Sequence, residues 1–260
     1  MTSDCLYPVL KFSTRYRQSL PIKEQKMKKG RIALTLVLSI LLCAIIGGVM
    51  YLYFNGYSGF DNHSKATHGE IKVACVGDSI TYGHGITNWP KNNYPRLLGD
   101  MLGDGYAVNN YGHHGATLQS TGDQPYISYS DYDDSIEFGA DVLILMLGSN
   151  DAKLENWTDE AAFRAEYLRL LESYRASNPD IRIILCTPPK SYRKNSENPI
   201  RADIIAGVVR EIANEEGLQL VDVNALTDGR RDLYLSDGAH LSNEGARILA
   251  EAIYNAIISE

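Results

Sequence analysis

The chain has 260 residues, enough for one domain of ordinary size and additional segments. Its content of 44% hydrophobic and 22% charged residues is typical of a globular protein and excludes a disordered one. Residues 1–69 contain nine Lys and Arg against three Asp and Glu, whereas residues 70–260 contain 16 against 29 and carry a net charge of −13. Because so acidic a body repels phosphate groups, and no basic stripe offsets it, we expect no nucleic-acid partner.

A long apolar segment is the first recognisable element of the chain. Residues 32–54 form a run of 23 residues without a charge. As a helix this run would be about 34 Å long, enough to span a hydrocarbon core of about 30 Å. A buried core helix is the alternative, but such a helix normally keeps a polar face and this run has none. The run therefore predicts a transmembrane helix.

The residues that flank this segment predict its orientation. Lys65 is the only basic residue between the apolar run and Glu70, whereas seven basic residues lie shortly before the run: Arg15, Arg17, Lys23, Lys26, Lys28, Lys29 and Arg31. Basic residues are retained in the cytoplasm, so residues 1–31 are expected to form a cytoplasmic tail. The sequence thus predicts a single-pass protein of the cell membrane, with the rest of the chain extracellular.

The N-terminal region has two further features. The residues that follow the apolar run contain no small-residue cleavage site, which favours an uncleaved anchor over a signal peptide. Met27 opens a basic segment typical of the start of such an anchor, so we hypothesise that residues 1–26 are not translated; N-terminal sequencing of the native protein tests this. Residues 55–69 are rich in Gly, Asn, Ser and His and predict a flexible linker, which leaves residues 70–260 as the folded domain.

From Glu70 onward, short apolar runs alternate with segments of helical periodicity. The runs predict five strands, at Ile71–Val76, Tyr106–Asn109, Val142–Leu147, Ile181–Cys186 and Leu218–Val223. The intervening segments predict helices at Tyr94–Leu102, Asp159–Ser177, Ile200–Glu216 and Asn243–Ile258. This alternation predicts a parallel sheet covered on both faces, a three-layer α/β/α sandwich.

Polar and small residues gather where the predicted strands end. The first strand runs into residues 77–80, the second into residues 110–115 and the third into residues 148–151, while residues 237–240 follow the fifth. Ligands of open parallel sheets bind beyond the carboxyl ends of the strands. These four segments are therefore expected to meet at one pocket.

Three of these residues have the chemistry of a serine nucleophile and its base. The Ser79 hydroxyl needs a base to remove its proton, and an imidazole such as that of His240 titrates near neutral pH. Asp237, three residues earlier, is placed to hold the imidazole in one tautomer. Taken singly, each has an ordinary alternative: a helix cap for Ser79, a surface position for His240 and a turn for Asp237.

Acyl transfer also needs hydrogen-bond donors for the oxyanion. Gly115 can offer a backbone N–H without a side chain in the way, and Asn150 can offer a side-chain amide. A turn glycine and a turn-stabilising asparagine are the alternatives at these two positions.

Together these segments resemble the sequence blocks of the SGNH hydrolases, also called the GDSL esterase/lipase family. Gly77-Asp78-Ser79-Ile80, continued through Gly85, is similar to the first block. The pattern Asn110-x-Gly112-x-x-Gly115-x-Thr117 is similar to the second block, residues 148–151 to the third and Asp237-x-x-His240 to the last. The resemblance spans residues 70–258 and keeps the family's order and spacing.

This resemblance implies a serine hydrolase of carboxylic esters with a five-stranded, flavodoxin-like sheet and with no metal or organic cofactor. It implies Ser79 as the nucleophile, His240 as the base and Asp237 as the residue that orients it. It also implies an oxyanion hole made of Ser79, Gly115 and Asn150. None of these five positions departs from the family's pattern.

The substrate is less well determined by the sequence. Residues 117–138 are expected to form one pocket wall, and their tyrosines, amides and carboxylates suit a sugar-bearing substrate with a short acyl group better than a long acyl chain. A solvated loop is the alternative. Residues 122–126, with Asn156 and Trp157, also resemble the carbohydrate-esterase branch that includes sialate-acetylesterase-like enzymes. We therefore expect deacetylation of carbohydrate, with a lysophospholipase or lipid esterase, or an O-acetyltransferase of cell-wall sugar, as alternatives.

Metal and redox sites are not expected. His113 and His114 could ligate a metal, but adjacent histidine side chains rarely converge, and the acidic residues 131–134 are expected to be solvated rather than to hold calcium. Cys75 and Cys186 lie in predicted strands and are expected to fill the core, since the four cysteines have no spacing suited to zinc. No nucleotide-binding loop is present, and the oligomeric state is left open.

Overall fold

The structure is a computed structural model that describes residues 22–56, 70–194 and 198–259. The chain divides into two compact units, within residues 1–60 and within residues 61–260. The boundary predicted between tail, anchor, linker and domain stays a prediction, because residues 1–21 and 57–69 lie outside the described residues.

The first unit contains one long helix, α1 (Ile22–Gly56). Within it, Arg31–Gly48 has a mean hydropathy of 2.2, and none of this segment is buried. A helix of this length and composition can cross a membrane, although a signal sequence near an N-terminus has the same properties. The helix also includes Asn55 and Gly56, the first two residues of the predicted linker.

The second unit is built on a five-stranded parallel sheet. Its strands, in chain order, are β1 (Ile71–Gly77), β2 (Tyr106–Gly112), β3 (Val142–Met146), β4 (Arg182–Cys186) and β5 (Gln219–Val221). Their spatial order is β2-β1-β3-β4-β5, the flavodoxin-like order. The predicted fold class is therefore confirmed.

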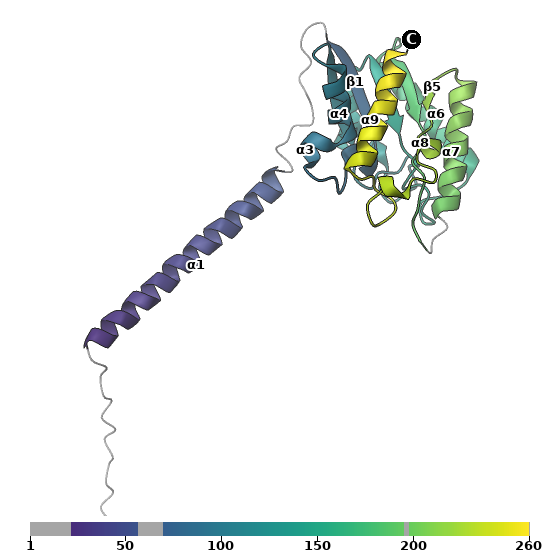
Figure 1. The fold of residues 1–260 in the computed structure, drawn as a ribbon. Coiled ribbons are helices and arrows are strands. Elements are labelled where there is room, and N and C mark those ends of the chain that lie inside the picture. Colours follow the sequence, from purple (N-terminus) through teal and green to yellow (C-terminus); the bar gives the residue numbers. More distant parts are fainter. Residues whose placement is uncertain (1–21, 57–69, 195–197, 260) are drawn as a thin grey trace, which may run out of the picture. The chain divides into compact units, whose positions relative to one another are not determined.

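Helices cover both faces of this sheet. They are α2 (Ser79–Tyr82), α3 (Trp89–Asn92), α4 (Tyr94–Leu102), α5 (Ser130–Glu137), α6 (Glu160–Ser177), α7 (Asn198–Glu215), α8 (Val223–Leu226) and α9 (Asn243–Ile258), with short 3-10 turns at Tyr126–Ser128 and Arg231–Leu233. Helix α9 packs beside α4 (Figure 1), and α6 packs beside α7.

The core lies in two layers, one on each face of the sheet. Because successive side chains of a strand point to opposite faces, Val73 and Cys75 of β1 pack on the side of α4 and α9. Ala74 and Val76 pack on the side of α6 and α7. Cys75 and Cys186 are fully buried free thiols, which confirms their predicted place in the core.

One predicted strand ends elsewhere in the structure, and the structure has helices without a counterpart among the predictions, among them α3, α5 and α8. Strand β2 continues to Gly112 rather than ending at Asn109, because its backbone pairs with β1 as far as Gly77. Helix α5 was not predicted; it falls in a segment expected to form a pocket wall, and two of its acidic residues lie in its first turn, where the helix dipole favours negative charge. The other predicted boundaries agree within two residues.

Candidate active site

Ser79 stands at the carboxyl end of the β1 strand, where the chain turns into α2. Asp78 caps this helix: its Oδ1 accepts the N–H of Ile80 at 2.8 Å, and Ser79 is the first helical residue. The turn needs a glycine before it, because a Cβ on Gly77 would lie 2.1 Å from Thr81 Oγ1. Burial raises the pKa of Asp78, which is fully enclosed. The hydroxyl is thus fixed at the edge where the strands end.

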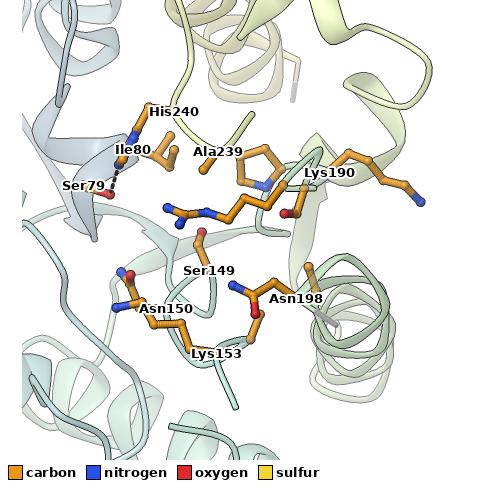
Figure 2. A pocket seen from close by; sticks show the side chains of 14 residues that line it. Ser79, Ile80, Ser149, Asn150, Lys153, Lys190, Asn198, Ala239 and His240 are labelled. Atoms are coloured by element: carbon orange, nitrogen blue, oxygen red, sulfur yellow. Dashed lines mark hydrogen bonds between the residues drawn. The ribbon is translucent and has the colours of Figure 1, made fainter. Parts of the chain in front are cut away.

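Ser79, His240 and Asp237 form one chain of hydrogen bonds. Ser79 Oγ lies 3.0 Å from His240 Nε2, and His240 Nδ1 lies 2.5 Å from Asp237 Oδ2. Figure 2 shows the first of these contacts. With Nδ1–H donated to the carboxylate, the Nε2 lone pair faces the serine hydroxyl, which is the arrangement that a general base requires.

The Asp237 carboxylate is itself held in place. Its Oδ1 accepts the backbone N–H groups of Ala239 at 3.0 Å and of His240 at 3.1 Å. Partial burial alone would raise the pKa of Asp237, but these hydrogen bonds and the imidazole outweigh it and lower the pKa to about 2. The group is therefore ionised over the whole range in which esterases are assayed.

The predicted oxyanion donors are only partly brought together. Asn150 lines the same pocket as Ser79, whereas Gly115 is not among the residues that line it. The Asn150 side-chain nitrogen donates one hydrogen to the Ala116 carbonyl at 3.0 Å, which leaves its second hydrogen for a substrate. Among the described residues, no acceptor is recorded for the backbone N–H of Ser79 or of Gly115. Each of the three residues thus keeps one N–H without a recorded acceptor among the described residues, but only Ser79 and Asn150 line the pocket.

Asp151, the last residue of the third block, has a structural place in this region to which the sequence analysis assigns no role. Its carboxylate is fully buried and accepts the backbone N–H groups of Leu118 at 2.9 Å and of Gln119 at 2.8 Å. Burial raises its pKa to about 7, against the lowering effect of those hydrogen bonds. Together with Asn150, Asp151 anchors the segment that follows Gly115 to the end of β3.

The walls of the pocket come from segments other than the one predicted. None of residues 117–138 lines it, which corrects the expectation that this segment forms a wall. The segment after β4 and the start of α7 supply that wall instead (Figure 2). The pocket is lined by Ser79, Ile80, Ser149, Asn150, Ala152, Lys153, Pro189, Lys190, Ser191, Arg193, Asn198, Ala202, Ala239 and His240.

Three cations lie in this lining although the domain as a whole is acidic. Lys190 is paired with Asp203 at 2.7 Å, and its pKa is raised by that hydrogen bond. Lys153 lies 3.8 Å from Asp123. Arg193 makes no recorded ion pair with the part of the chain that the structure describes. The pocket therefore presents polar and positively charged groups beside the nucleophile.

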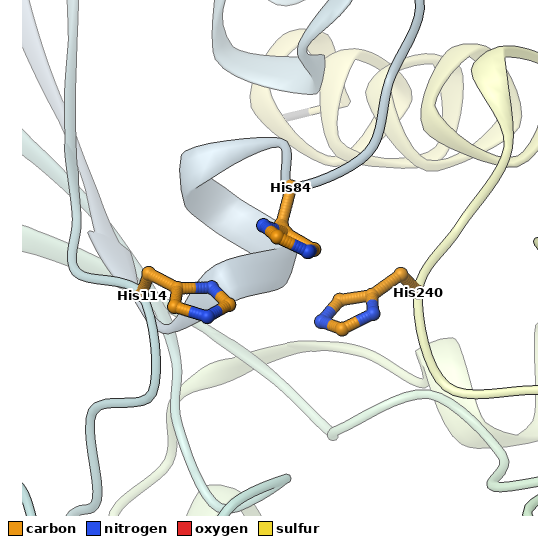
Figure 3. A group of neighbouring side chains, drawn as sticks. All are labelled: His84, His114 and His240. Atoms are coloured by element: carbon orange, nitrogen blue, oxygen red, sulfur yellow. The ribbon is translucent and has the colours of Figure 1, made fainter. Parts of the chain in front are cut away.

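A cluster of histidines adjoins the catalytic imidazole. The ring of His84 lies 4.3 Å from that of His114 and 4.6 Å from that of His240, measured between ring centroids. Figure 3 shows these three rings turned toward one another. His113 diverges as expected for adjacent histidines: its Nδ1 lies 2.9 Å from Asp131, and its ring stacks on Tyr129. Burial and the neighbouring imidazoles lower the pKa of His84 and of His114.

Comparison with known proteins identifies the family. Residues 75–248 match the model of the GDSL-like lipase/acylhydrolase family, and this range contains all four blocks. The chain belongs to that family. The predicted resemblance and the predicted enzyme class, an ester-hydrolysing enzyme, are thereby confirmed.

One curated relative is an acetylxylan esterase of Xylanibacter ruminicola. It is 34% identical to the chain, and the match covers 72% of the chain but 43% of the relative. The chain thus spans less than half the length of this relative.

Solved structures of similar fold include several esterases. A carbohydrate acetylesterase family member from Sinorhizobium meliloti has a TM-score of 0.61 at 20% identity, with 72% of this chain and 97% of that chain covered. The aryl esterase of M. smegmatis has a TM-score of 0.61 at 17% identity, covering 73% and 99%. A lipase/acylhydrolase from Enterococcus faecalis has a TM-score of 0.60 at 24% identity, covering 72% and 95%. At these identities the likeness supports the fold of the GDSL-like family.

Proposed function

We propose that this GDSL-like hydrolase is a membrane-anchored serine esterase that removes acetyl groups from carbohydrate outside the cytoplasm. Ser79 is the nucleophile, His240 the general base and Asp237 the group that orients it. The single observation that carries this proposal is the continuous contact from Ser79 Oγ through the His240 ring to Asp237, at 3.0 and 2.5 Å.

The reaction follows from this geometry. Ser79 Oγ attacks the carbonyl carbon of the acetyl group while His240 Nε2 takes the hydroxyl proton. The oxyanion receives hydrogen bonds from the N–H groups of Ser79 and Gly115 and from the Asn150 amide. The sugar oxygen leaves with the proton held on His240. A water molecule then attacks the acetyl-enzyme, His240 takes its proton, and acetate leaves as Ser79 is restored.

The lining of the pocket supports a short acyl group on a polar alcohol. Among the described residues that line the pocket, Ile80 is the only one with a large aliphatic side chain, so a long acyl chain would find little apolar surface. Ser191, Arg193 and Asn198 instead offer the hydrogen-bond donors and acceptors that sugar hydroxyls require. The acetylxylan esterase relative supports the same substrate class. The lipid-esterase alternative has no comparable support.

A substrate panel on the full chain in detergent tests this proposal. Acetylated xylan should release acetate, and turnover of p-nitrophenyl esters should fall steadily from acetate to decanoate. Ser79→Ala should lose several orders of magnitude in kcat. Ser128→Ala, a change at an exposed serine outside the pocket lining, is the matched control and should retain the activity of the wild type.

Three outcomes of that panel would point elsewhere. Activity that rises with acyl length would replace the carbohydrate substrate with a lipid ester. Transfer of acetyl to an added sugar acceptor, in preference to release of acetate, would make the enzyme an O-acetyltransferase. Equal turnover by the wild type and by Ser79→Ala would remove Ser79 from the mechanism.

The membrane anchor belongs to the same proposal and is tested separately. Its support is the apolar, fully exposed Arg31–Gly48 segment of α1 together with the basic residues that precede it. The protein should stay with the membrane fraction after alkaline extraction. A protease added to intact cells should release the catalytic domain. Recovery of the whole protein in the soluble fraction would refute the anchor and leave the esterase unaffected.

A further inference from the structure

The His84, His114 and His240 side chains form a group of potential metal ligands that lie close together. One ligand nitrogen from each ring can be chosen so that all three lie within 4.8 Å of one another. In a tetrahedral zinc site with Zn–N bonds of about 2.0–2.1 Å, the nitrogens are about 3.4 Å apart. The largest nitrogen–nitrogen distance, at most 4.8 Å, would therefore have to shorten by about 1.4 Å. Small rotations of the histidine side chains can supply this change.

We propose that these three histidines bind a divalent transition-metal ion of the zinc class and that the bound ion inhibits the esterase. The inhibition follows because the ion occupies the Nε2 lone pair of His240, the same lone pair that accepts the Ser79 proton. The inference goes beyond the proposed function and rests on it only for the role of His240.

The surroundings of His240 favour this site. Metal-ligating histidines almost always donate their other ring N–H to a carboxylate or carbonyl, which fixes the tautomer and raises the basicity of the ligand nitrogen. Asp237 provides this contact to Nδ1 at 2.5 Å. The structure that prepares His240 as a general base therefore also prepares its Nε2 as a metal ligand.

His84 and His114 are available as the other two ligands. No hydrogen bond of either ring to a residue that the structure describes is recorded, and both residues are exposed to solvent. Neutral imidazole is a good ligand for zinc, copper and nickel. With three histidines bound, the fourth position stays open to water or to Ser79 Oγ, the coordination pattern of an open zinc site.

The three histidines are brought together by the fold rather than by a local motif. His84 follows α2, His114 lies in the loop after β2, and His240 lies between the 3-10 turn at Arg231–Leu233 and α9. Figure 3 shows that the three come from separate loops at one edge of the sheet. The neighbouring His113 belongs to a different contact, with Asp131, and is not part of the group.

An inhibition series on the full chain in detergent tests the proposal with Zn²⁺ as the probe and p-nitrophenyl acetate as the substrate. Zn²⁺ should inhibit the wild type, and a chelator should restore activity. His84→Phe and His114→Phe keep a ring at each position but remove its nitrogens, so each should raise the half-inhibiting Zn²⁺ concentration by about 10–100-fold or more. His113→Phe is the matched control and should be inhibited like the wild type.

A binding measurement that does not depend on activity completes the test. Titration of Ser79→Ala with Co²⁺ should give the intense visible absorption of a tetrahedral site at one equivalent. The same titration of a Ser79→Ala and His84→Phe double variant should lose it. If Ser79→Ala stays active, the proposed mechanism fails while the metal site stands. If Co²⁺ gives no saturable absorption, the metal site is refuted. It is also refuted if Zn²⁺ inhibits His84→Phe and His114→Phe to the same degree as the control His113→Phe.

Discussion

The buried carboxylate of Asp151 allows a sharp test of how the active-site loops are held. It accepts two backbone N–H groups, at 2.9 and 2.8 Å, from Leu118 and Gln119, and so ties the segment after Gly115 to the end of β3. Its replacement by asparagine keeps the shape of the side chain. One oxygen can still accept, but the amide nitrogen then faces the other N–H donor, which costs about 1–3 kcal/mol.

The pH dependence of this cost follows from the pKa of Asp151, which burial raises from 3.8 to about 7. Between these two pH values the Asp151 carboxyl keeps its proton in the folded protein but has lost it in the unfolded chain. The stabilising contribution is therefore complete below about pH 4 and is lost as the pH rises through 7. At roughly 1.4 kcal/mol for each pH unit between the two values, the loss is about 4 kcal/mol.

The amide introduced by Asp151→Asn cannot titrate, so the two proteins should respond differently to pH. The variant should be about 1–3 kcal/mol less stable than the wild type at pH 4 and should become the more stable protein by about the same amount at pH 8. Urea unfolding followed by fluorescence of the two tryptophans measures both free energies at each pH. A difference that stays constant within about 1 kcal/mol from pH 4 to 8 would refute the assignment of a buried, titrating Asp151.

The remaining predictions concern catalysis. Asp237→Asn should lower kcat by about 10⁴ with little change in KM for p-nitrophenyl acetate, because the His240 ring is no longer held in the tautomer that a general base requires. A changed KM with an unchanged kcat would contradict this. The pKa of Asp237 lies at about 2, so Asp237 should stay ionised down to pH 4, and a plot of log(kcat/KM) against pH should keep a slope of one on its acid side. A slope that steepens to two above pH 4 would show that Asp237 takes up a proton in that range. Gly115→Ala should lower kcat by about 10²–10³, because φ is +86° and a Cβ would lie 2.6 Å from Gln124; unchanged kinetics would exclude Gly115 from the oxyanion hole.

The sheet and the contact between Ser79, His240 and Asp237 could be predicted because their signals are local. Each buried strand is a short apolar run, and parallel strands bring the residues that follow them to one edge. That rule alone predicts the meeting of Ser79 and His240, which are 161 positions apart. No distance or angle was needed for that step.

The wall of the pocket after β4 could not be predicted, because its place depends on the tertiary structure and not on a local sequence pattern. Arg193 and Asn198 follow β4 without any periodicity, and only the position of that strand next to β3 brings them to Ser79. Helix α5 has a similarly weak local signal, because Ser130–Glu137 is polar over most of its length. Its contacts are tertiary and include a hydrogen bond between Ser135 Oγ and Tyr174 OH at 2.6 Å. Arg193 and Asn198 follow the carboxyl end of β4, so the rule that ligands bind beyond the strand ends also covers them.

The group formed by His84, His114 and His240 could not be predicted either, because the fold and not the sequence spacing brings its members together. The adjacent His113 and His114 have divergent side chains, as their adjacency predicts. The relevant neighbours of His114 are His84 and His240, 30 and 126 positions away. All three rings stand on loops at the edge where the strands end, and that shared place, not close spacing in the sequence, is the signal that joins them.

The proposed nucleophile and the proposed metal depend on a single atom. His240 Nε2 can accept a proton from Ser79 or bind an ion, but it has one lone pair and cannot do both. The Asp237 contact strengthens Nε2 for either partner, so improving the base also improves the ligand. Metal occupancy and turnover must therefore exclude each other, and a substitution of Asp237 should weaken zinc inhibition together with catalysis. Variants of His84 and His114 should separate the two, because these rings contact the ion and not the reacting atoms.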